Sequence, residues 1–131
     1  MKILKDQLLS NYSSMRIGGK AKFLCHAEKK DDFLAASEFA RKNSLKVITI
    51  GRGTNIIFTD SGFNGLVVVN NYQGHSIEGE TISANSGSSW DEIVAESVAN
   101  NLVGIEALSL VPGTVGGAPV NNIGAYGQEI K

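Results

Sequence analysis

Residues 108–127 read LSLVPGTVGGAPVNNIGAYG, a run of small residues with five glycines between Gly113 and Gly127. Glycine permits positive φ angles and lets a ligand approach the main chain closely, and cofactor loops need both properties. The run lacks the Gly-Lys-Ser/Thr ending of nucleoside triphosphate sites. Its small side chains, with Asn122 and Tyr126, indicate contact with a flat ring system whose polar edge bonds to backbone amides. A helix of small residues packed against a sheet is the alternative that this segment alone leaves open.

A second glycine-rich stretch lies upstream, where residues 50–58 read IGRGTNIIF. Gly-x-Gly after a strand resembles a Rossmann fingerprint, but that fingerprint needs a third glycine and a following helix. Here a strand is expected to follow, so the Rossmann interpretation fails. A loop between strands can still hold a diphosphate through successive backbone N–H groups, with donors from Thr54 and Asn55 and charge from Arg52. A tight turn that uses glycine and asparagine for their permissive angles explains the same residues without a ligand.

Apolar periodicity predicts both helices and strands outside these two segments. We expect strands at 20–28, 47–50, 56–58 and 65–69, a hairpin of 75–78 and 81–85, and helices at 30–43 and from Ser89 to about Asn100. Ser89 and Glu92 have the spacing of a capping box, and Trp90, Ile93, Val94 and Val98 are expected to form the buried stripe of the second helix. Pro112 is a candidate for a cis peptide bond.

The composition bounds the class of protein. With 42% hydrophobic and 19% charged residues in 131, the chain is expected to be a soluble globular domain with a real core. The formal net charge is −1 and no basic stretch occurs, so neither nucleic acid nor a membrane is expected as a partner. A single cysteine, Cys25, favours a reducing compartment, the cytoplasm. Cys25 and His26 have no further ligand at metal-binding spacing, so no metal site is expected.

Three motifs, in this order and at these spacings, resemble the flavin-dependent UDP-N-acetylenolpyruvoylglucosamine reductases of peptidoglycan synthesis. Residues 15–21, MRIGGKA, are similar to the opening signature of the family, and residues 51–55 to its pyrophosphate loop. Residues 112–117 with 122–127 are similar to its central flavin-contacting motif. The resemblance runs from about Asn11 to Ile130. Two departures are conservative: residues 13–15 are SSM where the family often has Thr-Thr-Phe, and Thr54 stands where serine is common.

The resemblance implies an α+β fold of the FAD-binding PCMH, or vanillyl-alcohol-oxidase, type, in which FAD lies between two small α+β subdomains. Residues 1–131 would form this domain incompletely, with about 1–70 as the first subdomain and about 71–131 as the start of the second. The C-terminal substrate-binding domain of the family would be absent. In the implied reaction NADPH reduces non-covalently bound FAD, and the reduced flavin converts a UDP-sugar enolpyruvyl ether, UDP-N-acetylglucosamine enolpyruvate, to UDP-N-acetylmuramate.

The family's cofactor contacts carry over onto both glycine-rich segments. Those implied at the diphosphate are Gly51, Arg52, Gly53, Thr54, Asn55 and Ile56. Those implied along the rest of the cofactor are Val111, Pro112, Thr114, Gly116, Gly117, Asn122 and Gly124, with Tyr126 near the flavin and the nucleotide substrate. The family's substrate-polarising arginine, proton-donating serine and late glutamate are expected beyond Lys131. We therefore expect no catalytic residue within this chain, and little reductase activity from it alone.

Two other functions remain open from the sequence. One is another FAD oxidoreductase of the same fold, although neither segment contains the His or Cys through which many such oxidases attach flavin covalently. The other is a non-catalytic nucleotide-binding module that has lost its substrate domain.

Overall fold

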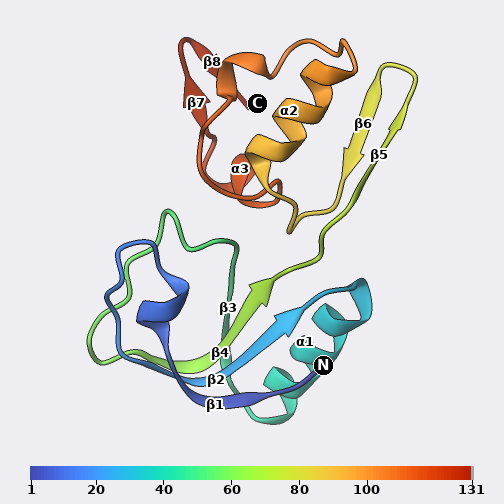
Figure 1. Ribbon diagram of the computed structural model, residues 1–131. Helices are drawn as coiled ribbons and strands as arrows, with labels where there is room; N and C mark the ends of the chain where they lie inside the picture. Colours follow the sequence, from blue (N-terminus) through green and yellow to red (C-terminus); the bar gives the residue numbers. More distant parts are fainter. Residues whose placement is uncertain (131) are drawn as a thin grey trace. The chain divides into compact units, whose positions relative to one another are not determined.

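Two compact units make up the chain in the computed structural model, which describes residues 1–130 (Figure 1). The first unit is Met1–Asn71 and the second begins at Tyr72. Helices and strands occur in both units, and the α+β class is confirmed. Within the described residues, only the first unit contains a sheet of more than two strands.

The first unit is built on a four-stranded sheet of order β1-β2-β4-β3. Its strands are β1 (Leu4–Leu8), β2 (Lys20–Ala27), β3 (Lys46–Ile50) and β4 (Phe63–Asn70). β2, β4 and β3 run parallel, and β1 pairs antiparallel at the edge. The central strand β4 is buried throughout Gly65–Val69, as expected of a strand that is covered on both faces.

Each face of this sheet has its own apolar core. Helix α1 (Lys30–Lys42) buries Ala36 and Ala40 against one face, beside Cys25. The short 3-10 helix η1 (Leu9–Tyr12) covers the other face, where Leu9 and Phe58 pack together. The sheet is thus covered on both faces, and the first glycine-rich loop begins directly after Ile50, where β3 ends.

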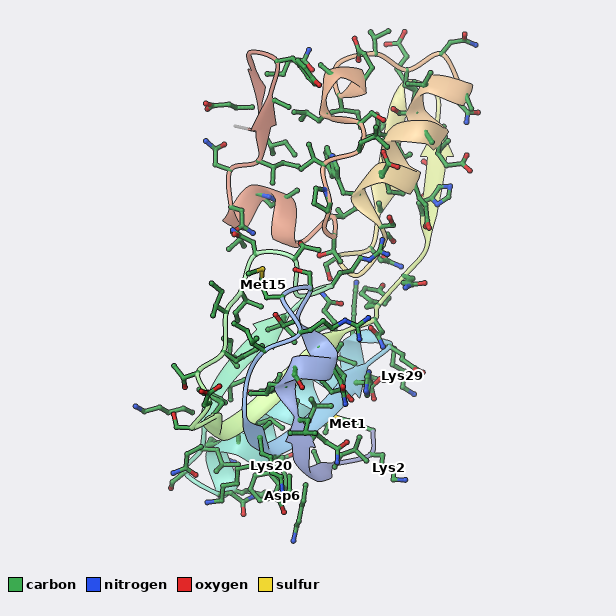
Figure 2. All side chains as sticks on the ribbon, turned by 60° about the vertical axis from the view of Figure 1, so that its left-hand side comes forward. Met1, Lys2, Asp6, Met15, Lys20 and Lys29 are labelled. Atoms are coloured by element: carbon green, nitrogen blue, oxygen red, sulfur yellow. The ribbon has the colours of Figure 1, made fainter. Side chains whose placement is uncertain are left out.

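The first turn of α1 is organised by Asp32. Its carboxylate accepts hydrogen bonds from the backbone N–H groups of Glu28, at 3.0 Å, and Lys29, at 3.3 Å. The Met1 ammonium lies 3.6 Å from the same carboxylate; Met1 and Lys29 are marked in Figure 2. The backbone hydrogen bond from Glu28, more than the nearby positive charges, holds the pKa of Asp32 below its ordinary value. The carboxylate supplies the acceptor that the N-terminal amides need.

The second unit collects short elements around an indole. They are β5 (His75–Glu78), β6 (Thr81–Ala84), α2 (Trp90–Ala99), η2 (Glu106–Leu108), α3 (Gly117–Val120), β7 (Gly124–Ala125) and β8 (Gln128–Glu129). The ring of Trp90 packs with Val94, Leu108 and Ala118. Its indole N–H donates to the Leu108 carbonyl oxygen at 2.9 Å, so the ring is buried without leaving its polar atom unpaired.

Several local expectations were wrong, each because a tertiary contact outweighs the sequence pattern. Residues 56–58 form no strand: Phe58 enters the core while Ile57 stays 68% exposed. The side chain of Ser89 makes no capping hydrogen bond to α2, and the backbone of Ser89 pairs with Thr114 in an isolated bridge.

The buried stripe of α2 contains Ser97 in place of Val98, which is 53% exposed. The Ser97 hydroxyl is satisfied locally, by the Val94 carbonyl at 2.8 Å. The peptide bond before Pro112 is trans, since residues 1–130 contain no cis peptide bond.

The dependence of thermal stability on pH, on the acidic side, tests the role of Asp32. Because its folded pKa lies below 3.8, its charge stabilises the fold above that value, and the stabilisation is lost as pH falls through the folded pKa. Asp32→Asn should lower the thermal midpoint by a few degrees near neutral pH, and the difference from wild type should shrink as the pH is lowered below 3.8. Circular dichroism melts across this range measure it. Asp31→Asn, in the same helical turn, is the control and should change little. A deficit that is independent of pH would show that the charge of Asp32 is not what stabilises the helix.

Candidate functional site

The first candidate segment, Gly51–Asn55, directly follows β3. It therefore lies at the carboxyl end of the parallel strands, where open sheets bind ligands. Gly53 is buried and has φ +67°, a left-handed conformation. Arg52 and Asn55 are exposed and Thr54 is partly exposed. The expected diphosphate residues, which end with Ile56, thus form one continuous turn in the first unit.

Two carbonyl groups of this turn point inward, toward residues 13 and 14. The Ser14 N–H donates to the Gly53 carbonyl oxygen at 2.9 Å, and the Ser13 hydroxyl donates to the Ile56 carbonyl oxygen at 3.2 Å. In a trans peptide the C=O and the following N–H point in opposite directions. The N–H groups of Thr54 and Ile57 therefore point away from Ser13 and Ser14. Backbone dipoles in this orientation favour an anion on the outer side of the loop.

A contact within the protein requires glycine at position 53. A Cβ atom at this position would stand 1.9 Å from the Tyr12 carbonyl oxygen. A larger residue would therefore force the turn away from Tyr12 and Ser13, whether or not a ligand binds. The close packing of two backbones sets the shape of the loop.

The opening signature supports the chain just beyond the loop. The Gly19 N–H donates to the Thr59 carbonyl oxygen at 2.9 Å. Gly18 has φ +130°, and a Cβ there would lie 2.6 Å from the Cβ of Phe58. Residues 12–19 thus hold residues 53–59 in place, with Ser13 as a buried bridge. In the sequence Ser13 stands out only as a departure from a family pattern, because its supporting role depends on a contact 43 residues along the chain.

The second candidate segment uses most of its amides internally. Val115 N–H donates to Ser88 O at 3.0 Å and Gly116 N–H to Ser86 O at 2.8 Å. The N–H groups of Gly117 and Ala118 both donate to Thr114 O, at 2.9 Å each. The expectation that amides of this segment bond to a ring edge is therefore wrong for residues 115–118. Any contact of Gly116 and Gly117 with a ligand would then use their Cα surface or their carbonyl oxygens.

Gly116, like Gly53, is required by packing within the protein itself. A Cβ on Gly116 would lie 2.8 Å from the Cβ of Ser86. Thr114 is buried, whereas Pro112 is exposed and Val111 packs partly into the core of the second unit. A helix forms over the four residues of α3, but its buried Ala118 packs with Trp90, Val94 and Leu108 and not against a sheet.

A hairpin brings the last three expected residues together. β7 and β8 are joined by Tyr126 and Gly127, with φ +50° and +84°, as in a type I′ turn. An aromatic residue is unfavourable in this conformation, and no burial compensates, since Tyr126 is 92% exposed. The Asn122 amide donates to the Glu129 carboxylate at 3.1 Å. Gly124 pairs with Glu129 across the hairpin.

Other chemically capable groups have structural surroundings. Burial raises the pKa of the Cys25 thiol to about 11, so the thiol stays protonated at neutral pH. The His26 ring nitrogen Nδ1 lies 3.0 Å from the Asn71 amide nitrogen. Residues 1–130 contain no group of three or more His, Cys, Asp or Glu that could hold a metal ion. No helix within this part of the chain is long and apolar enough to span a membrane.

Known proteins are similar to most of this chain. The FAD binding domain family matches residues 21–131. The UDP-N-acetylenolpyruvoylglucosamine reductase of Ralstonia nicotianae is 38% identical over 94% of this chain and 38% of its own length. That of Salinispora arenicola is 35% identical over 93% of this chain and 35% of its own length. The crystal structure of the Thermus caldophilus reductase matches with a TM-score of 0.77 and 26% identity, over 98% of this chain and 45% of that one. The chain thus spans little more than a third of these two curated relatives.

The close packing around Gly53 predicts that its replacement by alanine lowers the free energy of unfolding more than usual. Gly53→Ala combines a positive φ with a clash against the Tyr12 backbone and should cost about 3 to 5 kcal/mol. Gly79→Ala is the matched control: Gly79 has φ +58°, but a Cβ there would meet no atom within 4 Å, so strain alone should cost about 1 to 2 kcal/mol. Urea unfolding of both variants gives the comparison. Equal losses would mean that the contact with Tyr12 does not constrain the loop.

Proposed function

This chain belongs to the FAD binding domain family, and on that premise we propose that it is the FAD-binding part of a UDP-N-acetylenolpyruvoylglucosamine reductase. The relatives that carry this name match nearly the whole chain at 33–38% identity. The proposed reaction is the NADPH-dependent reduction of UDP-N-acetylglucosamine enolpyruvate to UDP-N-acetylmuramate in peptidoglycan synthesis. The proposed location is the cytoplasm, where this nucleotide substrate and NADPH would both be found.

The inward carbonyls of Gly53 and Ile56 carry the proposal for the first segment. They turn the amides of Thr54 and Ile57 outward. A diphosphate is an anion with many acceptor oxygens and no donors, so it fits such a surface. The exposed Arg52 adds positive charge, and Thr54 and Asn55 add side-chain donors. We assign the FAD diphosphate to this loop, with Gly51 at its start.

The second segment fits the flavin end of the cofactor. Flat rings are bound by close approach of small residues, and residues 111–117 with Asn122 and Gly124 provide them. The buried Oε1 of Gln128 has no hydrogen-bond donor among residues 1–130. A flavin carries N–H and O–H groups that could donate to such an acceptor. Tyr126, held on its hairpin with an exposed ring, is the group that we assign to the border between flavin and substrate.

The bound flavin supplies the hydride chemistry, and the protein supplies orientation and electrostatics. Reduction of an enolpyruvyl group also needs stabilisation of enolate charge and a proton donor. We assign neither role within residues 1–130. The roles of this chain in the proposed reaction are therefore to hold the cofactor by its diphosphate and to present its ring.

Flavin selectivity tests the diphosphate assignment. The chain should bind FAD, with flavin bands in its visible spectrum after gel filtration. Arg52→Glu should weaken FAD binding roughly 10- to 100-fold, because a charged contact to the diphosphate is replaced by repulsion. Binding of riboflavin, which has no phosphate, should be unchanged. Quenching of flavin fluorescence measures both ligands.

Arg41→Glu is the control for the change of charge, since Arg41 is exposed at the far end of α1 in the same unit. A folded, colourless protein that ignores added FAD would overturn the proposed function. An equal loss of riboflavin and FAD affinity in Arg52→Glu would overturn the diphosphate assignment alone.

Turnover provides a second test. Residues 1–131 should oxidise NADPH no faster with UDP-N-acetylglucosamine enolpyruvate than without it, since the polarising and proton-donating groups are not assigned to this chain. Absorbance at the NADPH band, with a full-length relative as the positive control, measures this. Substrate-dependent turnover by this chain alone would show that the proton donor lies within it.

A further inference from the structure

Two consecutive residues at the start of α2 hold the segment that leads into the second glycine-rich run. Asp91 Oδ1 accepts from the Leu110 backbone N–H at 2.6 Å and from the Ser109 hydroxyl at 3.1 Å. Trp90 donates through its indole to the Leu108 carbonyl at 2.9 Å and through its backbone N–H to the Gly113 carbonyl at 3.2 Å. One helical turn thus bonds to the chain on both sides of residues 111 and 112.

Leu110 is held in a conformation that leucine disfavours. Its φ is +62°, and its side chain is 81% exposed, so apolar burial does not compensate for the strain. Two hydrogen bonds hold this conformation: the charge-assisted bond from the Leu110 N–H to Asp91, which is stronger than a bond between neutral groups, and a turn bond of 3.4 Å from the Val111 N–H to the Leu108 carbonyl oxygen. Without the bond to Asp91, only the longer turn bond would oppose the strain at Leu110, and its φ would be less firmly fixed.

The conformation at Leu110 decides where the next residues go. Pro112 has a fixed φ, and a residue before proline is restricted to extended conformations. Val111 and Pro112 therefore form a stiff pair whose direction is set at Leu110. On the other side, Gly113 is fixed by Trp90. A change of φ at residue 110 would swing residues 111 and 112 as a unit.

We propose that Asp91 is a positioning residue for the flavin contacts of residues 111–114. It acts by fixing Leu110 at positive φ, and this role rests on the proposed function. Attraction to the helix dipole alone would give the same benefit to Glu92, its neighbour in the first turn. Glu92 is exposed, and its side chain makes no hydrogen bond or ion pair with the rest of the described chain. The two carboxylates are therefore distinguished by contact and not by charge.

The experiment compares Asp91→Ala with Glu92→Ala in this chain. Asp91→Ala should speed hydrogen exchange at the Leu110 amide at least tenfold, read by NMR, and should weaken FAD binding by about tenfold, read by fluorescence quenching. Glu92→Ala should change neither quantity by more than about twofold. Circular dichroism should show that both variants stay folded, because the indole of Trp90 still anchors α2 to Leu108.

A second substitution separates positioning from general loosening. In the Asp91→Ala background, Leu110→Gly should recover much of the lost FAD affinity, since glycine takes positive φ without strain. Leu110→Ala removes the same side chain but keeps the strain, so it should recover none. Recovery by alanine as well as glycine would overturn the backbone mechanism.

The outcomes distinguish this role from the proposed function. A wild-type chain that does not bind FAD would overturn both, although faster exchange at Leu110 in Asp91→Ala would still show that the carboxylate fixes this backbone. If the wild type binds FAD and Asp91→Ala binds it equally well, the positioning role alone is wrong.

Discussion

The hydrogen bond from the Ser14 N–H to the Gly53 carbonyl is the interaction on which the first candidate site depends. It requires that two stretches of backbone touch, which is possible only because residue 53 has no Cβ. Once the carbonyl is turned inward, the next amide must face outward. The positive φ of Gly53 and the outward amide of Thr54 are thus two consequences of one contact.

The second unit repeats this arrangement with different elements. The Gly113 carbonyl accepts from the Trp90 N–H, and Gly113 has φ +149°. A threonine follows in both places, and in both its amide points away from the segment that holds the glycine. In the first unit the support comes from a segment near the N-terminus, and in the second from the first turn of α2. The likeness lies in the backbone, so it does not depend on a shared sequence around the two supports.

The sequence predicted the regular elements well where apolar spacing follows one local partner. β2, α1 and the hairpin of β5 and β6 lie close to their expected bounds. Prediction failed where a distant residue decides the outcome. The apolar run 56–58 reads as a strand, yet only Phe58 is buried, because the Ser13 hydroxyl takes the Ile56 carbonyl. Ser89 reads as a cap, yet its side chain makes no capping hydrogen bond, and its backbone pairs with Thr114, 25 residues along the chain.

The positions of the candidate residues could be predicted from the sequence. The contacts that require those residue types could not. The glycines marked the two segments correctly as places of close approach. At Gly53 and Gly116, however, the approaching group is another part of the same chain. Asp91 carries no pattern that separates it from Glu92, and only the return of residues 109 and 110 to α2 reveals its role. A glycine in a motif indicates that some group comes close to the main chain. The motif does not indicate whether that group belongs to a ligand or to the protein.

These internal contacts bear on binding as well as on folding. A loop that a ligand must order loses conformational entropy when the ligand binds, and that loss weakens affinity. Here the turns at Gly53 and Gly113 are held by hydrogen bonds within their own units. A diphosphate or ring would therefore meet backbone groups that already point in the required direction. A cofactor motif suggests that these glycines contact the ligand directly. Their effect on the ligand is indirect, because they let the protein hold the loop in its binding conformation before the ligand arrives.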